Sequence, residues 1–271
     1  MSSINATDAI FAPKSVAVIG ASTTPGKVGH DIFVNILKGG YTGTLYPVNP
    51  SARSIASVRA YKSLTEIPDE IDLGIVILPP KAALQSVQEA VTKGVKGIVI
   101  VSAGFREIGP EGRAIEDRLV ATCREAGVRL IGPNCLGVIN PLPAVRLNAS
   151  FSTRMPKAGN VSFISQSGAL CTAVLDFAAD RNFGSSKFIS IGNKADVDEL
   201  DLLRYLHRDH DTEVILIYVE ELRRGPEFIE AVKEITCGDY RPKPVLVIKS
   251  GRTSAGAQAA ASHTGSLAGT E

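Results

Sequence analysis

The sequence of 271 residues predicts two consecutive α/β units, each built around an open, mostly parallel sheet. Three observations support this prediction. Short runs rich in β-branched residues alternate with helical patterns along most of the chain. Glycines gather where the expected strands end, and the length suits about two domains of ~150 residues each. Strands that alternate with helices pair in parallel through right-handed crossovers, so we expect doubly wound sheets.

The first half contains five expected strands. Between the first two, Val28, Ile32 and Ile36 recur at helical spacing. Gly94 and Gly127 follow two further helical patterns, where glycine is a common stop signal. The expected strands are Ser15–Ile19, Thr44–Val48, Asp72–Leu78, Gly97–Val101 and Val128–Ile131, and the two later helices are Ala82–Lys93 and Glu111–Glu125.

Residues 141–159 carry prolines and few periodic apolar residues, which is typical of a linker. We therefore predict a first domain at residues 1–143, a linker at 144–159 and a second domain at 160–271. Because the small-residue stretch Ser250–Gly269 is followed by no closing element, we expect the second domain to be incomplete. Its expected strands are Val161–Ile164, Lys187–Ile191, Glu213–Val219 and Pro244–Lys249, with helices at Gly168–Arg181, Asp198–His207 and Pro226–Ile235.

Charge and composition exclude several classes of protein. The 29 Lys and Arg against 28 Asp and Glu give a net charge of +1, which argues against a nucleic-acid-binding or polybasic membrane-binding protein. A hydrophobic content of 44% supports a folded core, and no apolar run approaches the ~18 residues of a membrane span. The four cysteines form no CxxC pair, so we expect neither a disulfide framework nor a zinc site, and a cytoplasmic location.

A glycine-rich turn follows the first expected strand, from Gly20 to Gly29. Such a turn lets backbone N–H groups approach a phosphate at the N-terminus of the next helix. It is not a P-loop, because five residues separate Gly20 from Gly26 and Val28 occupies the Ser/Thr position. NAD is disfavoured, since the second strand ends at Asn49 without the acid that binds its ribose. A nucleotide-bearing ligand and a tight turn without ligand both remain open.

The turn Ser165–Gly168 precedes the first helix of the second half. Serine hydroxyls and free N–H groups at a helix start can bind an anion. The alternative is that Ser167 simply caps the helix.

His263 lies in a small-residue stretch after a parallel strand, the side of an open α/β sheet where ligands bind. A neutral imidazole can be a nucleophile toward phosphorus, and Glu220, at another strand end, could supply its orienting carboxylate. The alternative is an ordinary loop histidine. His207 and His210 have helical i, i+3 spacing but lie among charged residues, so we predict an exposed helix end and no metal site.

Seven ordered motifs together resemble the nucleoside-diphosphate-forming acyl-CoA synthetase superfamily. They are SVAVIGAS…PGKVG, YPVNP, GPNCLGVINP, ISQSGAL, SIGNKADVDELDLLRYL, YVEE and SHTGSLAG, and they span nearly the whole chain. The chain is most similar to the α subunit or α portion of ADP-forming acetyl-CoA synthetases, and more distantly to the α subunit of succinyl-CoA synthetase.

The resemblance implies a Rossmann-like CoA-binding domain followed by a flavodoxin-like domain with a phosphorylated histidine. The implied reaction is acyl-CoA + phosphate + ADP ⇌ acid + CoA + ATP, through an acyl phosphate and a phosphohistidine. His263 would carry the phosphoryl group, and Glu220 would stabilise the phosphorylated ring.

The resemblance also assigns binding residues. The turn after the VNP motif often carries a lysine for the CoA phosphates in this family; Ser51-Ala52-Arg53 stands there in this sequence, and Arg53 would have to take the place of that lysine. Phosphate would bind at Ser165, Gln166, Ser167 and Gly168. Coenzyme A would bind at Gly20, Ser22, Thr23, Thr24, Pro25, Asn49, Pro50, Arg53, Val101, Ser102, Ala103, Asn134 and Cys135. Cys171, Thr172 and Asn193 would lie near the acyl group.

Family members use an ATP-grasp module for nucleotide and magnesium, and nothing in this sequence resembles one. The resemblance therefore implies a partner, either an ATP-grasp β subunit or a C-terminal domain, in an oligomeric assembly that binds Mg-ADP or Mg-ATP. Two other functions remain open. One is a non-catalytic acyl-CoA-binding module of a protein acetyltransferase, which intact His263 and Glu220 argue against. The other is an NAD(H)-sensing regulator, opposed by the missing ribose-binding acid.

Overall fold

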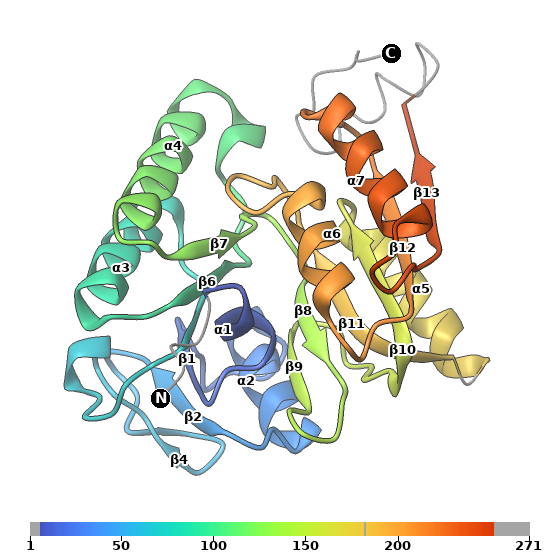
Figure 1. Cartoon of the computed structure of the whole chain (residues 1–271). Helices are drawn as coiled ribbons and strands as arrows, with labels where there is room; N and C mark the ends of the chain where they lie inside the picture. Colours follow the sequence, from blue (N-terminus) through green and yellow to red (C-terminus); the bar gives the residue numbers. More distant parts are fainter. Residues whose placement is uncertain (1–5, 182, 252–271) are drawn as a thin grey trace.

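In the computed structural model, which describes residues 6–181 and 183–251, two sheets lie side by side (Figure 1). The first sheet has five strands in the order β2-β1-β5-β6-β7, and every pair is parallel. The prediction of a doubly wound parallel sheet in this half is therefore confirmed. The strands are β1 Ser15–Ile19, β2 Thr44–Val48, β5 Leu73–Val76, β6 Gly97–Ile100 and β7 Arg129–Ile131.

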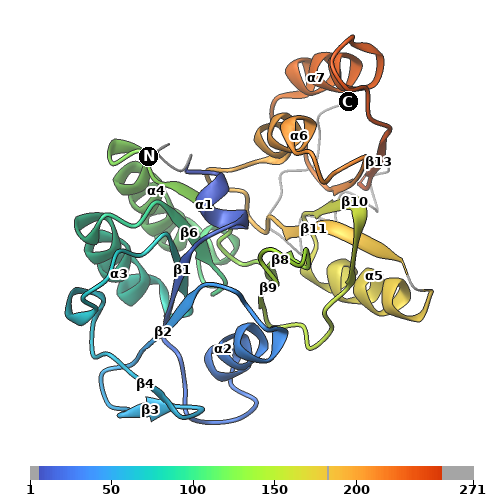
Figure 2. The ribbon, with the colours of Figure 1, turned by 60° about the horizontal axis from the view of Figure 1, so that its bottom comes forward.

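Helices cover both faces of the first sheet (Figure 2). Alternate residues of β1 point to opposite faces, so Val18 packs with α2 while Ile19 packs with α3 and α4. Gly40 and Gly94 close α2 and α3 in the left-handed conformation, at φ 75° and 84°. The helices of this half are α1 Asp8–Phe11, α2 Val28–Gly39, α3 Pro80–Lys93 and α4 Pro110–Glu125.

The second sheet has six strands in the order β13-β12-β10-β11-β8-β9. The four strands predicted for this half pair in parallel, whereas β8 pairs antiparallel with both β11 and β9. The sequence interpretation missed this hairpin, which lies in the segment assigned to the end of the first domain and to the linker. The strands are β8 Gly137–Asn140, β9 Leu147–Ser150, β10 Lys157–Ser165, β11 Gly184–Ser190, β12 Val214–Val219 and β13 Val245–Lys249.

Three helices flank the second sheet, namely α5 Gly168–Asp180, α6 Glu199–Arg208 and α7 Gly225–Cys237. Helix α5 buries Cys171 and Leu175 against one face, whereas α6 and α7 pack on the other face in a core shared with α2. Helix α6 begins at a capping box between Asp198 and Asp201, in which each side chain accepts from the other residue's backbone N–H. The shared core joins the two halves into one body.

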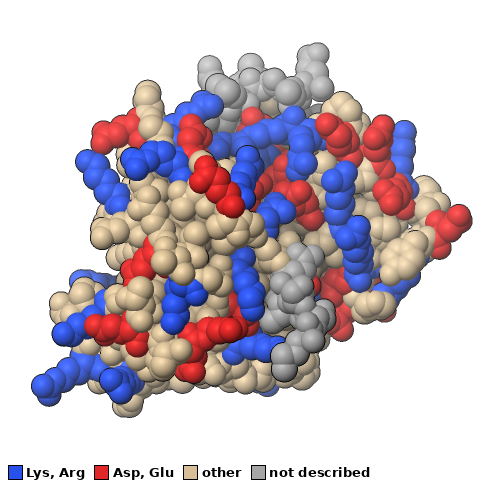
Figure 3. Space-filling model, turned by 60° about the vertical axis from the view of Figure 1, so that its left-hand side comes forward, with Lys and Arg blue, Asp and Glu red and all other residues tan. Residues whose placement is uncertain are grey.

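Short elements connect the larger ones. They are the hairpin of β3 Ser54–Ile55 and β4 Val58–Arg59 and the 3-10 turns η1 Leu64–Glu66 and η2 Arg106–Ile108. Within the described part of the chain, no helix is both long and apolar enough to cross a membrane. On the face shown in Figure 3, acidic and basic side chains are interspersed, as the near-zero net charge suggests.

Candidate functional site

A cavity of about 590 Å³ lies where the loops at the carboxyl ends of β6 and β7 meet the start of α5. Ligands of open α/β sheets bind at such carboxyl ends. The cavity joins residues predicted for coenzyme A with residues predicted for phosphate and the acyl group, although the two sets lie 31 or more positions apart in the sequence. The predicted residues that line it are Val101, Ser102, Ala103, Asn134, Cys135, Gln166, Gly168 and Thr172.

The turn after β1 is tight enough to require glycine. Gly20 has φ 91°, and a Cβ there would lie 2.4 Å from the carbonyl oxygen of Ile77. A Cβ on Gly29 would lie 2.1 Å from the carbonyl oxygen of Gly20, so the start of α2 also approaches this turn closely. The residues predicted to bind coenzyme A here, Ser22, Thr23, Thr24 and Pro25, form a solvent-accessible loop outside the cavity lining.

The turn after β2 is organised by Asn49. Its Nδ2 donates to the carbonyl oxygen of Ala21 at 2.8 Å, and its Oδ1 accepts from the N–H groups of Ser51 and Ala52. The Asn49 side chain therefore ties the β2 turn to the β1 turn. The neighbouring Pro50 and Arg53 are exposed and lie outside the cavity lining.

The turn before α5 is held by its own side chains. Ser165 Oγ accepts from the N–H of Ser167 at 3.1 Å and donates to the carbonyl oxygen of Ser167 at 2.8 Å. Ser167 Oγ accepts from the N–H of Leu170 at 3.3 Å, which confirms the capping interpretation of this serine. Both serines are buried, and Gly168 opens the helix at the cavity wall.

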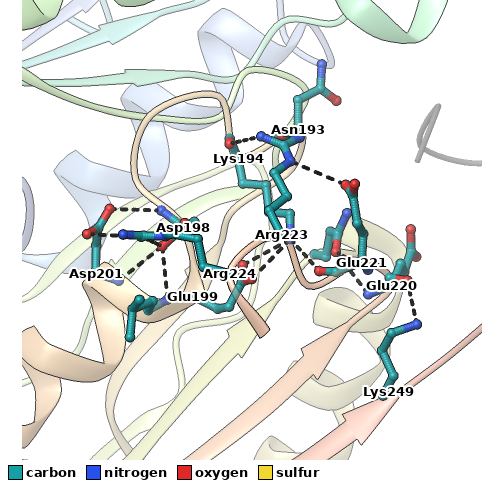
Figure 4. A network of polar contacts seen from close by, with 12 residues as sticks. Asn193, Lys194, Asp198, Glu199, Asp201, Glu220, Glu221, Arg223, Arg224 and Lys249 are labelled. Carbon is teal, nitrogen blue, oxygen red and sulfur yellow. Dashed lines mark hydrogen bonds and ion pairs between the residues drawn. The ribbon is translucent and has the colours of Figure 1, made fainter. Parts of the chain in front are cut away.

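Glu220 directly follows β12. The chain continues toward His263 from the end of the neighbouring strand β13. Val219 and Lys249 are register partners in β12 and β13, and Lys249 Nζ donates to the carbonyl oxygen of Glu220 at 2.9 Å (Figure 4). His263 itself lies outside the described residues.

The loop after β11 is anchored by buried charges (Figure 4). Lys194 is fully buried, and its Nζ lies 3.1 Å from Glu199 Oε2 and also donates to the carbonyl oxygen of Glu221. Arg223 donates to the carbonyl oxygens of Asn193 and Lys194 at 3.4 and 3.2 Å. The loop that carries Asn193 is thereby fixed against the end of β12.

The two cysteines near the cavity are protonated thiols at neutral pH. Burial raises the pKa of Cys135 to about 12, and burial likewise raises the pKa of Cys171 to about 12. Only the thiolate is a strong nucleophile, so neither residue fits that role. Cys171 packs in the core under α5 and does not line the cavity, unlike its neighbour Thr172.

Sequence reasoning missed five residues of the cavity wall. Ile77 and Leu136 adjoin predicted strand ends or predicted site residues, and that adjacency could have identified them. Phe151 follows the unpredicted strand β9, so no local pattern pointed to it. The missed residues are Val28, Ile77, Leu136, Phe151 and Ala169, and all five are apolar.

Within residues 6–181 and 183–251, no group of three or more His, Cys, Asp or Glu side chains is arranged to hold a metal ion. His207 Nε2 donates to the carbonyl oxygen of Tyr240 at 2.8 Å, and Arg241 donates to His210 Nδ1. The two histidines thus bind the segment after α7.

Family models and individual relatives match nearly the whole chain. The CoA binding domain model matches residues 14–141, and the succinyl-CoA ligase like flavodoxin domain model matches residues 158–271. An ADP-forming acetate–CoA ligase I subunit alpha from Pyrococcus furiosus is 46% identical, covering 97% of this chain and 57% of that protein. An ADP-forming 4-hydroxybutyrate–CoA ligase from Nitrosopumilus maritimus is 40% identical, covering 97% of this chain and 37% of that protein.

A solved structure has the same fold over the same region. It is the dinucleotide forming acetyl-coenzyme A synthetase 1 of Ca. Korarchaeum cryptofilum, solved in complex with phosphate and ADP, with a TM-score of 0.90 and 40% identity. The match covers 97% of this chain and 55% of that one, so this chain spans about half the length of its relatives, or less. The sequence resemblance is confirmed, and the chain belongs to the nucleoside-diphosphate-forming acyl-CoA synthetase superfamily.

Proposed function

We propose that this chain is the CoA-binding and phosphohistidine part of an ADP-forming acid–CoA ligase. The observation that carries the proposal is that one cavity, of about 590 Å³, adjoins the loops after β6 and β7 on one side and Gly168 of α5 on the other. Coenzyme A and phosphate must meet at the thioester, and this cavity joins the residues assigned to each.

In the first step, inorganic phosphate attacks the carbonyl carbon of the acyl-CoA. The carbon–sulfur bond breaks, and the proton of hydrogen phosphate goes to the departing thiolate, which gives an acyl phosphate and free CoA. Backbone N–H groups at the start of α5 would hold the phosphate, because the helix N-terminus carries a partial positive charge. The buried hydroxyls of Ser165 and Ser167 keep this turn in place.

In the second step, the unprotonated nitrogen of the neutral His263 imidazole attacks phosphorus, the bond from phosphorus to the acyl oxygen breaks, and the acid leaves as its carboxylate anion. The carboxylate of Glu220 would stabilise the phosphorylated ring. The chain leaves β13 beside the end of β12, where Glu220 lies, which supports this pairing. Transfer of the phosphoryl group to ADP would take place on an ATP-grasp subunit or domain. We place the protein in the cytoplasm, because all four cysteines are free thiols.

The phosphohistidine is tested by incubating the chain and its ATP-grasp partner with γ-labelled ATP. We expect a phosphoryl adduct that is stable in base and labile in acid, and that is discharged by CoA together with the acid substrate. The His263→Ala variant should lose the label, and His210→Ala, a substitution at an exposed histidine of the same chain, should retain it. Label that persists in His263→Ala would contradict the assignment, and a chain that binds acyl-CoA but never accepts phosphate would be a binding module.

A further inference from the structure

Two carboxylates from the first half of the chain converge on one amide of the second half. Asn193 Nδ2 donates to Glu107 Oε2 at 2.7 Å and to Glu116 Oε2 at 2.9 Å. Glu107 belongs to η2 and Glu116 to α4, whereas Asn193 lies in the loop after β11. Asn193 is 3% exposed and Glu116 is 1% exposed, so water has little access to the bond between them, whereas Glu107 is half-buried.

These bonds determine which way the Asn193 carboxamide points. A primary amide has two N–H groups, and ionised carboxylates only accept hydrogen bonds, so the amide nitrogen must face Glu107 and Glu116. The amide oxygen then faces the other way, where Oδ1 accepts from Asn134 Nδ2 at 3.3 Å. Asn134 lines the cavity. A continuous chain of hydrogen bonds therefore runs from the two carboxylates to the cavity wall.

Each carboxylate is itself fixed in place. Glu107 Oε1 accepts from the N–H groups of Gly104 and Phe105, and Glu116 forms an ion pair with Arg106. Burial by itself would raise the pKa of Glu107, but the hydrogen bonds from Asn193, Gly104 and Phe105 hold it below its ordinary value. Glu107 is thus an ionised acceptor at neutral pH.

We propose that Glu107 and Glu116 are positioning residues of the ligase, which hold Asn193, and through it Asn134, in one orientation toward the acyl-CoA thioester. This inference rests on the proposed function, which places the thioester in the cavity. Neither carboxylate lines the cavity, so both act through the two asparagines. With one N–H of Asn134 donated to Asn193, its second N–H is available to the thioester oxygen, which becomes negative when phosphate attacks.

The test is a Glu107→Gln substitution, which keeps shape and removes one acceptor. The new amide must direct its own N–H groups either at Asn193 or at the N–H groups of Gly104 and Phe105, so either Asn193 or the η2 turn that supports it loses its fixed position. We expect kcat for acyl-CoA phosphorolysis in the complete ligase to fall by about 10²-fold, the usual cost of a misplaced reacting geometry. KM for acyl-CoA should stay within about twofold, because ligand contacts are unchanged. Glu111→Gln, at an exposed position of α4, is the matched control and should retain full activity.

A purely structural role predicts a different result. Loss of thermal stability with a parallel rise in KM, or an unchanged kcat, would overturn the positioning role. Glu116→Gln should act through the same amide, so the double variant should lose much less activity than the product of the two single losses, and multiplicative losses would contradict the proposal.

A measurement on the unsubstituted protein is independent of any folding defect. In ¹⁵N-labelled protein, both side-chain amide protons of Asn193 should resonate downfield of free asparagine, because each is donated to a carboxylate. Ordinary shifts for this amide would overturn the inference. A wild-type ligase that does not convert acyl-CoA and phosphate to CoA would instead refute the proposed function.

Discussion

Gln166 Oε1 accepts a hydrogen bond from the backbone N–H of Glu220, with 2.9 Å between oxygen and nitrogen. A second bond, from the N–H of Glu221 at 3.2 Å, reaches the same oxygen. One buried side chain thus connects the turn before α5 with the end of β12. In the proposed mechanism, these are the turn that holds phosphate and the residue that stabilises the phosphohistidine.

Replacing this side chain should loosen both elements. In Gln166→Leu, two backbone N–H groups lose their acceptor in a buried setting, which typically costs about 1–3 kcal/mol. We expect this loss in the free energy of unfolding, measured by urea denaturation, together with slower phosphorylation of His263. Gln85→Leu, on the exposed side of α3, should change neither quantity. Equal effects of the two substitutions would contradict the role of Gln166.

The ion pair of Lys187 and Asp209 predicts a large loss of stability when one partner is removed. Lys187 Nζ lies 2.8 Å from Asp209 Oδ2, and the two side chains are 3% and 11% exposed. Lys187→Met leaves a buried carboxylate unpaired, which costs about 3–5 kcal/mol. Lys81→Met, which removes the partner of Glu111 in an exposed pair, should cost less than about 1 kcal/mol. Adding Asp209→Leu to Lys187→Met should restore much of the lost stability. A further decrease in the free energy of unfolding would contradict this explanation.

The ion pair of Lys187 and Asp209 also predicts that the stability of the fold depends on pH. Burial by itself would raise the pKa of Asp209, but the hydrogen bonds from Lys187 and Thr212 hold it below its ordinary value. A depressed pKa in the folded state stabilises the fold above the unfolded-state value of about 4, and this contribution disappears as the pH falls below that value. In urea denaturation between pH 7 and 3, the stability advantage of the wild type over Asp209→Asn should therefore shrink below pH ~4. A constant difference would contradict the prediction.

The cysteines should differ sharply in reactivity. Burial raises the pKa of Cys123, Cys135 and Cys171 to about 12, whereas Cys237 is exposed. At pH 8 we expect iodoacetamide to modify one thiol per folded chain, as measured by intact mass, and Cys237→Ser to abolish the modification. Rapid modification of Cys135 would show a thiolate in the cavity and would reopen its role as a nucleophile.

Much of the fold could be predicted because local periodicity reflects burial. The bounds of β1 and β2 coincide with the predicted Ser15–Ile19 and Thr44–Val48, since both are short runs of apolar residues that end at a turn. The hairpin of β8 and β9 was missed because Leu147–Ser150 is only four residues long and includes two polar residues. It is buried by α2 and the second sheet, which no local pattern reveals.

The loops of the site could be predicted from the sequence, but the hydrogen bonds between residues of different loops could not. Glycines and serines after strands identified the turns, because only certain residues suit such turns. The bond between Asn193 and Glu107 joins residues 86 positions apart, and Glu107 showed no motif of its own. Such a contact depends on how the two halves pack, and periodicity reports only the structure of each segment.

The most direct test of the central claim is calorimetric titration of this chain with coenzyme A, and separately with NADH. We expect one CoA site per chain and no NADH binding, because the β2 turn ends at Asn49 without a ribose-binding acid. The Ala103→Trp variant, which fills part of the cavity, should weaken CoA binding at least tenfold, whereas Ala126→Trp, after α4, should not. Binding of NADH without binding of CoA would contradict the account.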